Sequence, residues 1–127
     1  RRGTCGDYYC DANKVCGVPC AEVDIMEANR FSFLSTLHAS TDPIGHGDGY
    51  GGGTKDATGK WTNSGPRSFS EMEYGPMGEC VSTMKPFQVA VYFPVNTMAA
   101  LEAMEVRLSQ QGMPCSVKLR VAGYSGL

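Results

Sequence analysis

Three segments in the C-terminal half of the chain alternate hydrophobic and polar residues with a period of two. They are FQVAVYF at 87–93, AMEVRLS at 103–109 and SVKLRVA at 116–122. This alternation is typical of strands that bury one face and expose the other, as in an antiparallel sheet. We therefore predict strands at about 86–94, 103–110 and 116–122 that form a meander. Its shared core is expected to hold Val89, Val91, Val106, Leu108, Leu119 and Val121.

The connections between these segments differ in length. QQGMPC at 110–115 is short and predicts a hairpin, whereas PVNTMAALEA at 94–103 is long enough for one helical turn capped by Asn96 or Thr97. Residues 42–66 are rich in glycine and small polar residues, which predicts a long loop. Such a loop is either functional or a flexible excursion, and both interpretations stay open. No helical pattern exceeds three turns, so the sequence predicts an all-β chain.

Length and charge limit the classes of function. The chain has 127 residues, enough for one hydrophobic core and hence a single domain over residues 1–127. With a net charge of −2 it offers no basic patch for nucleic acid, and no apolar run is long enough to span a bilayer. The chain begins Arg-Arg-Gly without a signal peptide, which indicates a processed chain or part of a longer protein.

The cysteines suggest cross-links. There are six, four close together and two distant: Cys5, Cys10, Cys16, Cys20, Cys80 and Cys115. An even number in a small, loop-rich chain favours disulfides and an oxidising compartment, either extracellular or another oxidising lumen. Free thiols and a four-cysteine zinc site are alternatives, although the first four lack the paired short spacings usual for zinc. The sequence does not determine how the cysteines pair.

Three carboxylates crowd the segment CAEVDIMEAN at 20–29: Glu22, Asp24 and Glu27. On a regular strand Glu22 and Asp24 share a face, and Glu27 points to the other side. One extra residue in the strand, a β-bulge, would turn Glu27 onto the face of Glu22. The two glutamates could then approach to roughly 5–6 Å, which is close to the separation in retaining glycosidases. A solvated acidic surface and a calcium site are the alternatives.

The same segment resembles the signature of a known enzyme family. EVDIMEAN, followed by a histidine eleven residues after its last glutamate, is similar to the Glu-x-Asp-x-x-Glu motif of glycoside hydrolase family 7, commonly EMDIWEAN. YCDAN at 9–13, HGDGYGG at 46–52 and YGP at 74–76 resemble other family segments in the same order. The resemblance covers about residues 8–95 and marks the chain as a shortened or partial member.

The resemblance implies both fold and activity. The family has an antiparallel β-sandwich of the jelly-roll, concanavalin-like type, here expected to be partial and to carry long Gly-rich loops. The implied reaction is retaining hydrolysis of β-1,4-glucosidic bonds in cellulose or a related β-glucan, with no cofactor. By position, Glu22 would be the nucleophile, Glu27 the acid/base, and Asp24 the residue that orients Glu22.

Candidate substrate-binding residues follow from the resemblance and from the aromatic surfaces that bind sugar rings: His38 beside the leaving group, Asn29, Trp61 and Tyr50. The chain departs from the family pattern at Met26, where the family usually has Trp, and at Ala39-Ser40, which replaces Pro-Cys. Trp61 is its only tryptophan, so tyrosines such as Tyr8, Tyr9 and Tyr74 are the other available platforms.

Two further classes of function remain open. The first is a non-catalytic structural or accessory subunit, derived from this hydrolase family, in a secreted or lumenal assembly whose partners the sequence does not identify. The second is a calcium- or zinc-binding module. Retention of all three acids favours the hydrolase, because a chain without catalytic work would be expected to lose one of them.

Overall fold

The protein is all-β. The computed structural model describes residues 3–53 and 67–123, which form nine strands in three small sheets and no helix. The strands are β1 (Glu22–Ala28), β2 (Ser32–His38), β3 (Asp48–Gly53), β4 (Arg67–Ser70), β5 (Tyr74–Gly75), β6 (Val81–Ser82), β7 (Gln88–Tyr92), β8 (Ala103–Ser109) and β9 (Val117–Ala122). Most neighbouring strands are antiparallel, while the β3–β4 and β5–β6 pairs are parallel.

The first sheet has the order β1-β2-β3-β4 and carries the three clustered acids on its edge strand β1. A tight turn joins β1 to β2. The Asn29 side-chain oxygen accepts hydrogen bonds from the N–H groups of Phe31 and Ser32, at 2.8 and 3.1 Å. An asparagine side chain stabilises a turn in this way, so Asn29 sets the reversal that brings β2 beside β1.

Strand β3 falls inside the segment predicted to be a long loop, so that prediction is wrong for residues 48–53. Four of its six residues are glycine, because neighbouring strands lie too close for side chains at these positions. A Cβ at Gly51 would collide with the carbonyl oxygen of Phe33, and one at Gly52 with that of Phe69. Propensity argues against strand in such a segment, but close packing between β2 and β4 requires glycine there. The remainder of the predicted loop, 54–66, lies outside the described residues.

The meander predicted in the C-terminal half is confirmed as the antiparallel sheet β7-β8-β9. Val106, Leu108, Leu119 and Val121 are at most 2% exposed, and Val91 packs against them. Val89 was predicted to join this core but is 37% exposed. It lies opposite Leu108 on β7, the edge strand, and strand alternation says nothing about whether an edge is covered.

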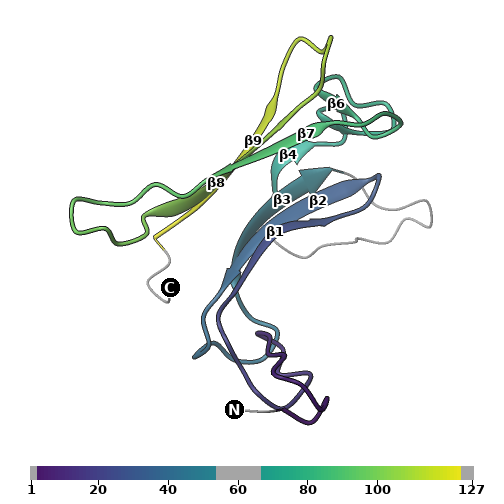
Figure 1. Ribbon diagram of the computed structural model, residues 1–127. Helices are drawn as coiled ribbons and strands as arrows, with labels where there is room; N and C mark the ends of the chain where they lie inside the picture. Colours follow the sequence, from purple (N-terminus) through teal and green to yellow (C-terminus); the bar gives the residue numbers. More distant parts are fainter. Residues whose placement is uncertain (1–2, 54–66, 124–127) are drawn as a thin grey trace.

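The connection between β7 and β8 forms a turn instead of the helical turn considered from sequence. The Asn96 side chain accepts hydrogen bonds from the N–H groups of Met98 and Ala100, at 2.9 and 3.0 Å. Val95 and Leu101 pair across the base of this turn. The result is a long hairpin that projects from the rest of the molecule (Figure 1).

The hydrophobic core lies where the β7–β8–β9 sheet crosses the first sheet (Figure 1). Tyr74 of β5 occupies its middle, with its ring 5.8 Å from the rings of Phe33, Phe69 and Phe87. Burial raises the pKa of Tyr74 to about 12. Its hydroxyl donates a 2.8 Å hydrogen bond to the Asn29 carbonyl, which ties the core to the β1–β2 turn.

All six cysteines form disulfides: Cys5–Cys16, Cys10–Cys20 and Cys80–Cys115. The zinc-site and free-thiol interpretations of the cysteines are therefore wrong. Two bridges lie in the N-terminal segment, and the third joins the region of β5 and β6 to the turn before β9. Three disulfides in so small a domain indicate an oxidising compartment, consistent with secretion. Within the described ranges, no helix is long and apolar enough to cross a membrane.

Candidate active site

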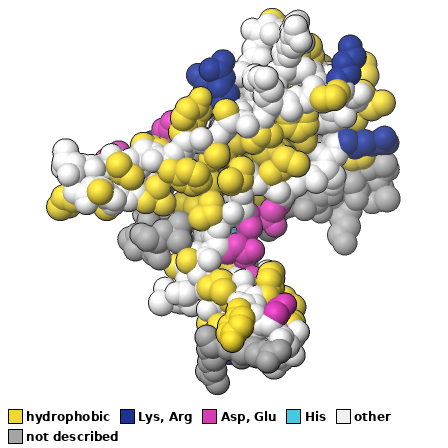
Figure 2. Space-filling view, in the orientation of Figure 1, with side chains coloured by type: hydrophobic (Ala, Val, Ile, Leu, Met, Phe, Trp, Pro, Cys, Tyr) yellow, Lys and Arg dark blue, Asp and Glu magenta, His cyan; other side chains and the backbone are white. Residues whose placement is uncertain are grey.

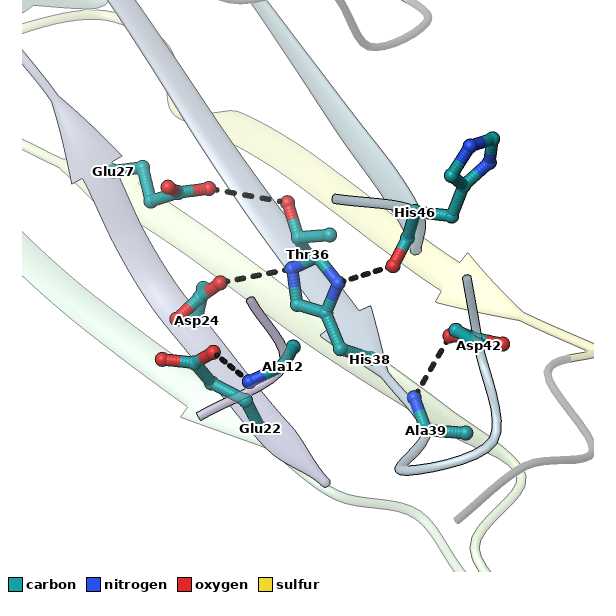
Figure 3. Close-up of polar contacts among 9 residues, drawn as sticks. All are labelled: Ala12, Glu22, Asp24, Glu27, Thr36, His38, Ala39, Asp42 and His46. Carbon is teal, nitrogen blue, oxygen red and sulfur yellow. Dashed lines mark hydrogen bonds and ion pairs between the residues drawn. The ribbon is translucent and has the colours of Figure 1, made fainter. Parts of the chain in front are cut away.

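The three acids of β1 lie on one face because the strand contains the predicted bulge. Glu22 pairs with His38 and Asp24 with Thr36, but the next paired residue is Glu27, opposite Leu34. Two residues of β1, Ile25 and Met26, therefore lie opposite one residue of β2, Ser35. The extra residue turns Glu27 to the same side of the strand as Glu22 and Asp24. Figure 3 shows the three carboxylates in order along the strand, beside His38.

Strand β2 holds the bulge on both of its faces. On the core side, the buried Ser35 hydroxyl donates a 2.7 Å hydrogen bond to the carbonyl of Ile25, one of the bulged residues. On the acid side, the Thr36 hydroxyl donates to Glu27 Oε2 at 3.3 Å. Because Thr36 lies opposite Asp24, its bond to Glu27 joins the two halves of the acid cluster across the bulge.

His38 and Asp24 form a nearly buried pair, 12% and 21% exposed. His38 Nδ1 lies 2.6 Å from the carbonyl oxygen of His46, and Nε2 lies 3.1 Å from Asp24 Oδ2. A carbonyl only accepts, so Nδ1 carries a hydrogen. The Nε2 contact then needs one more proton, held either by an imidazolium facing a carboxylate or by a protonated Asp24 facing a neutral imidazole. The pair shares one proton in either form.

Asp24 is the central acid of the cluster. Its pKa is raised from 3.8, first by burial and then by the negative charges of Glu22 and Glu27, while the charge and hydrogen bond of His38 oppose this rise. The central carboxyl of the three therefore accepts a proton more readily than an ordinary aspartate.

Glu22 is held by the N-terminal segment. Its Oε2 accepts a 3.0 Å hydrogen bond from the backbone N–H of Ala12. The resemblance assigned the orientation of Glu22 to Asp24, but among the described residues the structure has no hydrogen bond between these two carboxyls, and Asp24 faces His38 instead. Ala12 was not a predicted site residue, because its position depends on a disulfide pairing that the sequence leaves open.

Tyr9 lies at the rim of the cluster and is half exposed. Its pKa is raised, first by a hydrogen bond from its hydroxyl to the carboxylate of Asp11 and the charge of that group, then by burial and the charges of Glu22 and Asp24. The sequence offered Tyr9 only as one of several tyrosines. Its position directly before Cys10 is the signal that could have singled it out, since the Cys10–Cys20 bridge carries it towards β1.

On the acid side of the sheet, β3 carries two glycines. Gly49 lies opposite Thr36, and Gly51 lies opposite Leu34. Since side chains alternate along a strand, these two glycines occupy the β3 positions on the acid side. Both glycines are buried, and an added Cβ would meet the Thr36 side chain at Gly49 and Leu34 at Gly51, so glycine here allows β3 to pack closely against β2 beside the acids.

Two of the other predicted substrate-binding residues, Tyr50 and Asn29, do not join this face. Tyr50 lies opposite the buried Ser35, and it packs against the hydrophobic core. The side-chain oxygen of Asn29 is engaged in the β1–β2 turn, as described above. Trp61 lies outside the described residues. Of the three candidates within the described residues, His38 alone contacts an acid of the cluster.

No metal site accompanies the acids in the part of the chain that the structure describes. There, no three His, Cys, Asp or Glu side chains lie so as to hold a metal ion.

Figure 2 shows acidic side chains gathered at the narrow neck between the N-terminal segment and the sheets, with a broad hydrophobic area above them. Surface residues at the edge strands include Val23, Met26, Val89 and Phe93, which are 37–56% exposed.

Comparisons with protein-family models, with curated proteins and with solved structures found no match for this chain.

Proposed function

We propose that the acid face of β1 and β2 hydrolyses β-1,4-glucosidic bonds in cellulose or a related β-glucan, with retention of configuration. The observation that carries the proposal is the bulge, which sets Glu22 and Glu27 on one face with Asp24 between them. Retaining glycosidases need two carboxyl groups that flank the scissile bond about 5–5.5 Å apart, one to attack the sugar and one to transfer the proton, and two glutamates on one face of a strand can line such a site. The motif that resembles glycoside hydrolase family 7 supports the same assignment.

Each residue has a distinct part in this mechanism. Glu22 attacks the anomeric carbon and forms a glycosyl–enzyme ester. Its Oε2 takes the hydrogen bond of Ala12, so we assign the attack to Oε1. Glu27 gives its proton to the departing glycosidic oxygen, and then removes a proton from the water that cleaves the ester. The Thr36 hydroxyl orients Glu27 for both transfers.

Asp24 and His38 set the charge of the site. The raised pKa of Asp24 means that this central carboxyl gives up its proton less readily than an ordinary aspartate, so we assign the stabilisation of the developing positive charge on the sugar mainly to Glu22. The proposal includes the architecture of the whole domain, an antiparallel jelly-roll sandwich, and a secreted location. A core that draws side chains from two crossing sheets supports the sandwich, and the disulfides support secretion.

A second candidate function is a non-catalytic accessory subunit in a secreted assembly. It is favoured by the hydrophobic residues left uncovered on the edge strands β1 and β7, including Met26 at the bulge and Val89. Exposed hydrophobic residues on edge strands are typical of surfaces that another polypeptide covers. In this alternative the acids remain as relics, and Met26 in place of Trp reflects the loss of a sugar platform.

The experiment compares the wild-type chain with Glu22→Gln, Glu27→Gln and Asp24→Asn on two substrates, a β-1,4-glucan and an aryl β-cellobioside with a highly activated leaving group. Glu22→Gln should abolish the release of aryl alcohol as well as glucan cleavage. Glu27→Gln should reduce glucan cleavage by about 10²–10⁴-fold, yet retain the first step on the aryl substrate, whose leaving group needs no proton. Asp24→Asn should weaken cleavage less than Glu22→Gln.

Two results would contradict the proposal. Equal losses for Glu22→Gln and Glu27→Gln in the first step on the aryl substrate would reject the assignment of roles. A wild-type chain that cleaves neither substrate would favour the accessory subunit.

A further inference from the structure

We propose that the N-terminal segment, residues 3–20, is a positioning device for the nucleophile: its Cys10–Cys20 bridge holds the Ala12 N–H against Glu22 and so fixes the orientation of that carboxylate. The inference rests on the proposed role of Glu22 in hydrolysis. It makes Ala12 a positioning residue that acts through its backbone, and it gives the bridge a part in the site beyond the stability of the fold.

The bridge sits at equal sequence distance from both partners of the hydrogen bond. Ala12 comes two residues after Cys10, and Glu22 comes two residues after Cys20. Beside the disulfide, Asp11 and Pro19 form a parallel bridge, and the Cys20 N–H donates a 3.2 Å hydrogen bond to the Asp11 carbonyl. The two chain segments thus run side by side from the disulfide, and this delivers the Ala12 N–H to the Glu22 carboxylate.

Neighbouring contacts keep this arrangement rigid. Asp11 is buried, its Oδ1 accepts a 3.0 Å hydrogen bond from Val15, and its carbonyl also accepts one from Lys14. Ala12 itself is only 7% exposed. Cys5–Cys16 closes the far side of the segment, but it makes no link to β1. The two bridges therefore have different expected effects on Glu22.

Glu22 needs such a support because it is the first residue of β1. A residue at the end of an edge strand has few neighbours to limit its side chain, and terminal residues fray. A backbone N–H that donates to the carboxylate restricts its orientation. Attack on a sugar requires an aligned oxygen. The N-terminal segment therefore supplies the restraint on the Glu22 side chain that the end of the strand does not provide.

The first test uses proton–nitrogen correlation NMR spectra of the chain and needs no enzyme activity. Substitution Glu22→Gln replaces the charged acceptor of the Ala12 N–H by a neutral amide. The Ala12 amide proton should then show the largest change of chemical shift among the residues of the segment. An Ala12 amide that does not respond would overturn the proposal, even if the chain proved to be an active hydrolase.

The second test asks whether the bridge carries the effect. The double substitution C10S/C20S should abolish the response of the Ala12 amide to Glu22→Gln. The matched control C5S/C16S removes a bridge of nearly the same loop length, 11 residues against 10, and should leave the response in place. Unchanged amide resonances of the β7–β9 meander show that each variant is folded.

If C10S/C20S does not fold, Pro19→Gly tests the same link with both bridges intact, because it loosens the chain where it pairs with Asp11. It should weaken the Ala12 response, and an undiminished response would overturn the part assigned to the tether. In an active chain, folded C10S/C20S or Pro19→Gly should lower kcat on the activated aryl substrate by about tenfold or more at little-changed KM. Equal losses of kcat in C10S/C20S and C5S/C16S contradict the proposal, whereas inactivity of the wild-type chain counts only against hydrolysis.

Discussion

His38 Nε2 lies 3.1 Å from Asp24 Oδ2, while the other ring nitrogen, Nδ1, donates a hydrogen bond to the carbonyl of His46. This geometry places one shared proton at the centre of the acid cluster. The state of Asp24 therefore depends on His38 on one side and on Glu22 and Glu27 on the other. The first prediction separates these influences.

Substitution His38→Gln should raise the pKa of Asp24 further above 3.8, because the charge and hydrogen bond of His38 lower it. Glu22→Gln or Glu27→Gln should each lower the pKa of Asp24, because each removes a negative charge. The measurement is a carbon NMR titration of the Asp24 carboxyl. His46→Ala is the matched control, since the contact with His38 uses only the backbone carbonyl of His46. A lower pKa of Asp24 in His38→Gln would contradict the pairing.

The raised pKa of Asp24 also predicts how stability depends on pH. In the window above 3.8, the folded chain binds a proton at Asp24 more tightly than the unfolded chain does. The contribution of Asp24 to the free energy of unfolding is therefore fully present below this window and is lost as pH rises through the raised pKa. Asn cannot titrate, so Asp24→Asn should become more stable relative to wild type as pH increases. Urea unfolding at several pH values measures this, and a difference that shrinks with pH would be inconsistent with burial as the main cause.

Gly47 is predicted to be essential for the placement of His38. A Cβ at this position would collide with the imidazole ring and with the Leu37 carbonyl. Gly47→Ala should therefore displace His38, reduce the free energy of unfolding by about 1–3 kcal/mol and remove the effect of His38 on the Asp24 titration. Ser40→Ala, in the same connection but exposed, is the control. An unchanged Asp24 titration in Gly47→Ala would show that the loop can move without disturbing the pair.

Thr36→Val removes the hydroxyl that donates to Glu27 and keeps the shape of the side chain. In an active chain it should slow cleavage of a glucan about threefold to tenfold. The first step on an activated aryl cellobioside should change less, because that step does not need the proton of Glu27. Comparison of the two rates tests this, and a larger loss on the aryl substrate would place Thr36 in a different role.

Much of the fold could be predicted from local pattern. Alternation located β7, β8 and β9, and the spacing of Glu22, Asp24 and Glu27 predicted a bulge in β1. The exposure of Val89 could not be predicted in this way, because whether an edge strand is covered depends on elements far away in the sequence. Strand β3 was missed since its glycines are required by close backbone contacts, which propensity does not represent.

The candidate site was predictable only in part. The acids and His38 lie together because the bulge and the β1–β2 register place them there. Ala12 and Tyr9 reach the same site through the Cys10–Cys20 bridge, whose pairing the sequence leaves open. Tyr50 was assigned from residue type alone. Because side chains alternate along β3, Tyr50 lies on the face opposite to the acids and packs against the hydrophobic core.

The most direct test of the central claim is covalent labelling of the nucleophile. The chain is incubated with a 2-deoxy-2-fluoro-β-cellobioside that carries a dinitrophenolate leaving group, which permits the first displacement but slows the second. Mass spectrometry of the intact chain and of its peptides then locates the label. The account predicts one cellobiosyl ester on Glu22, formed also by Glu27→Gln and absent in Glu22→Gln. A label on Glu27 or elsewhere, or no label at all, would contradict it.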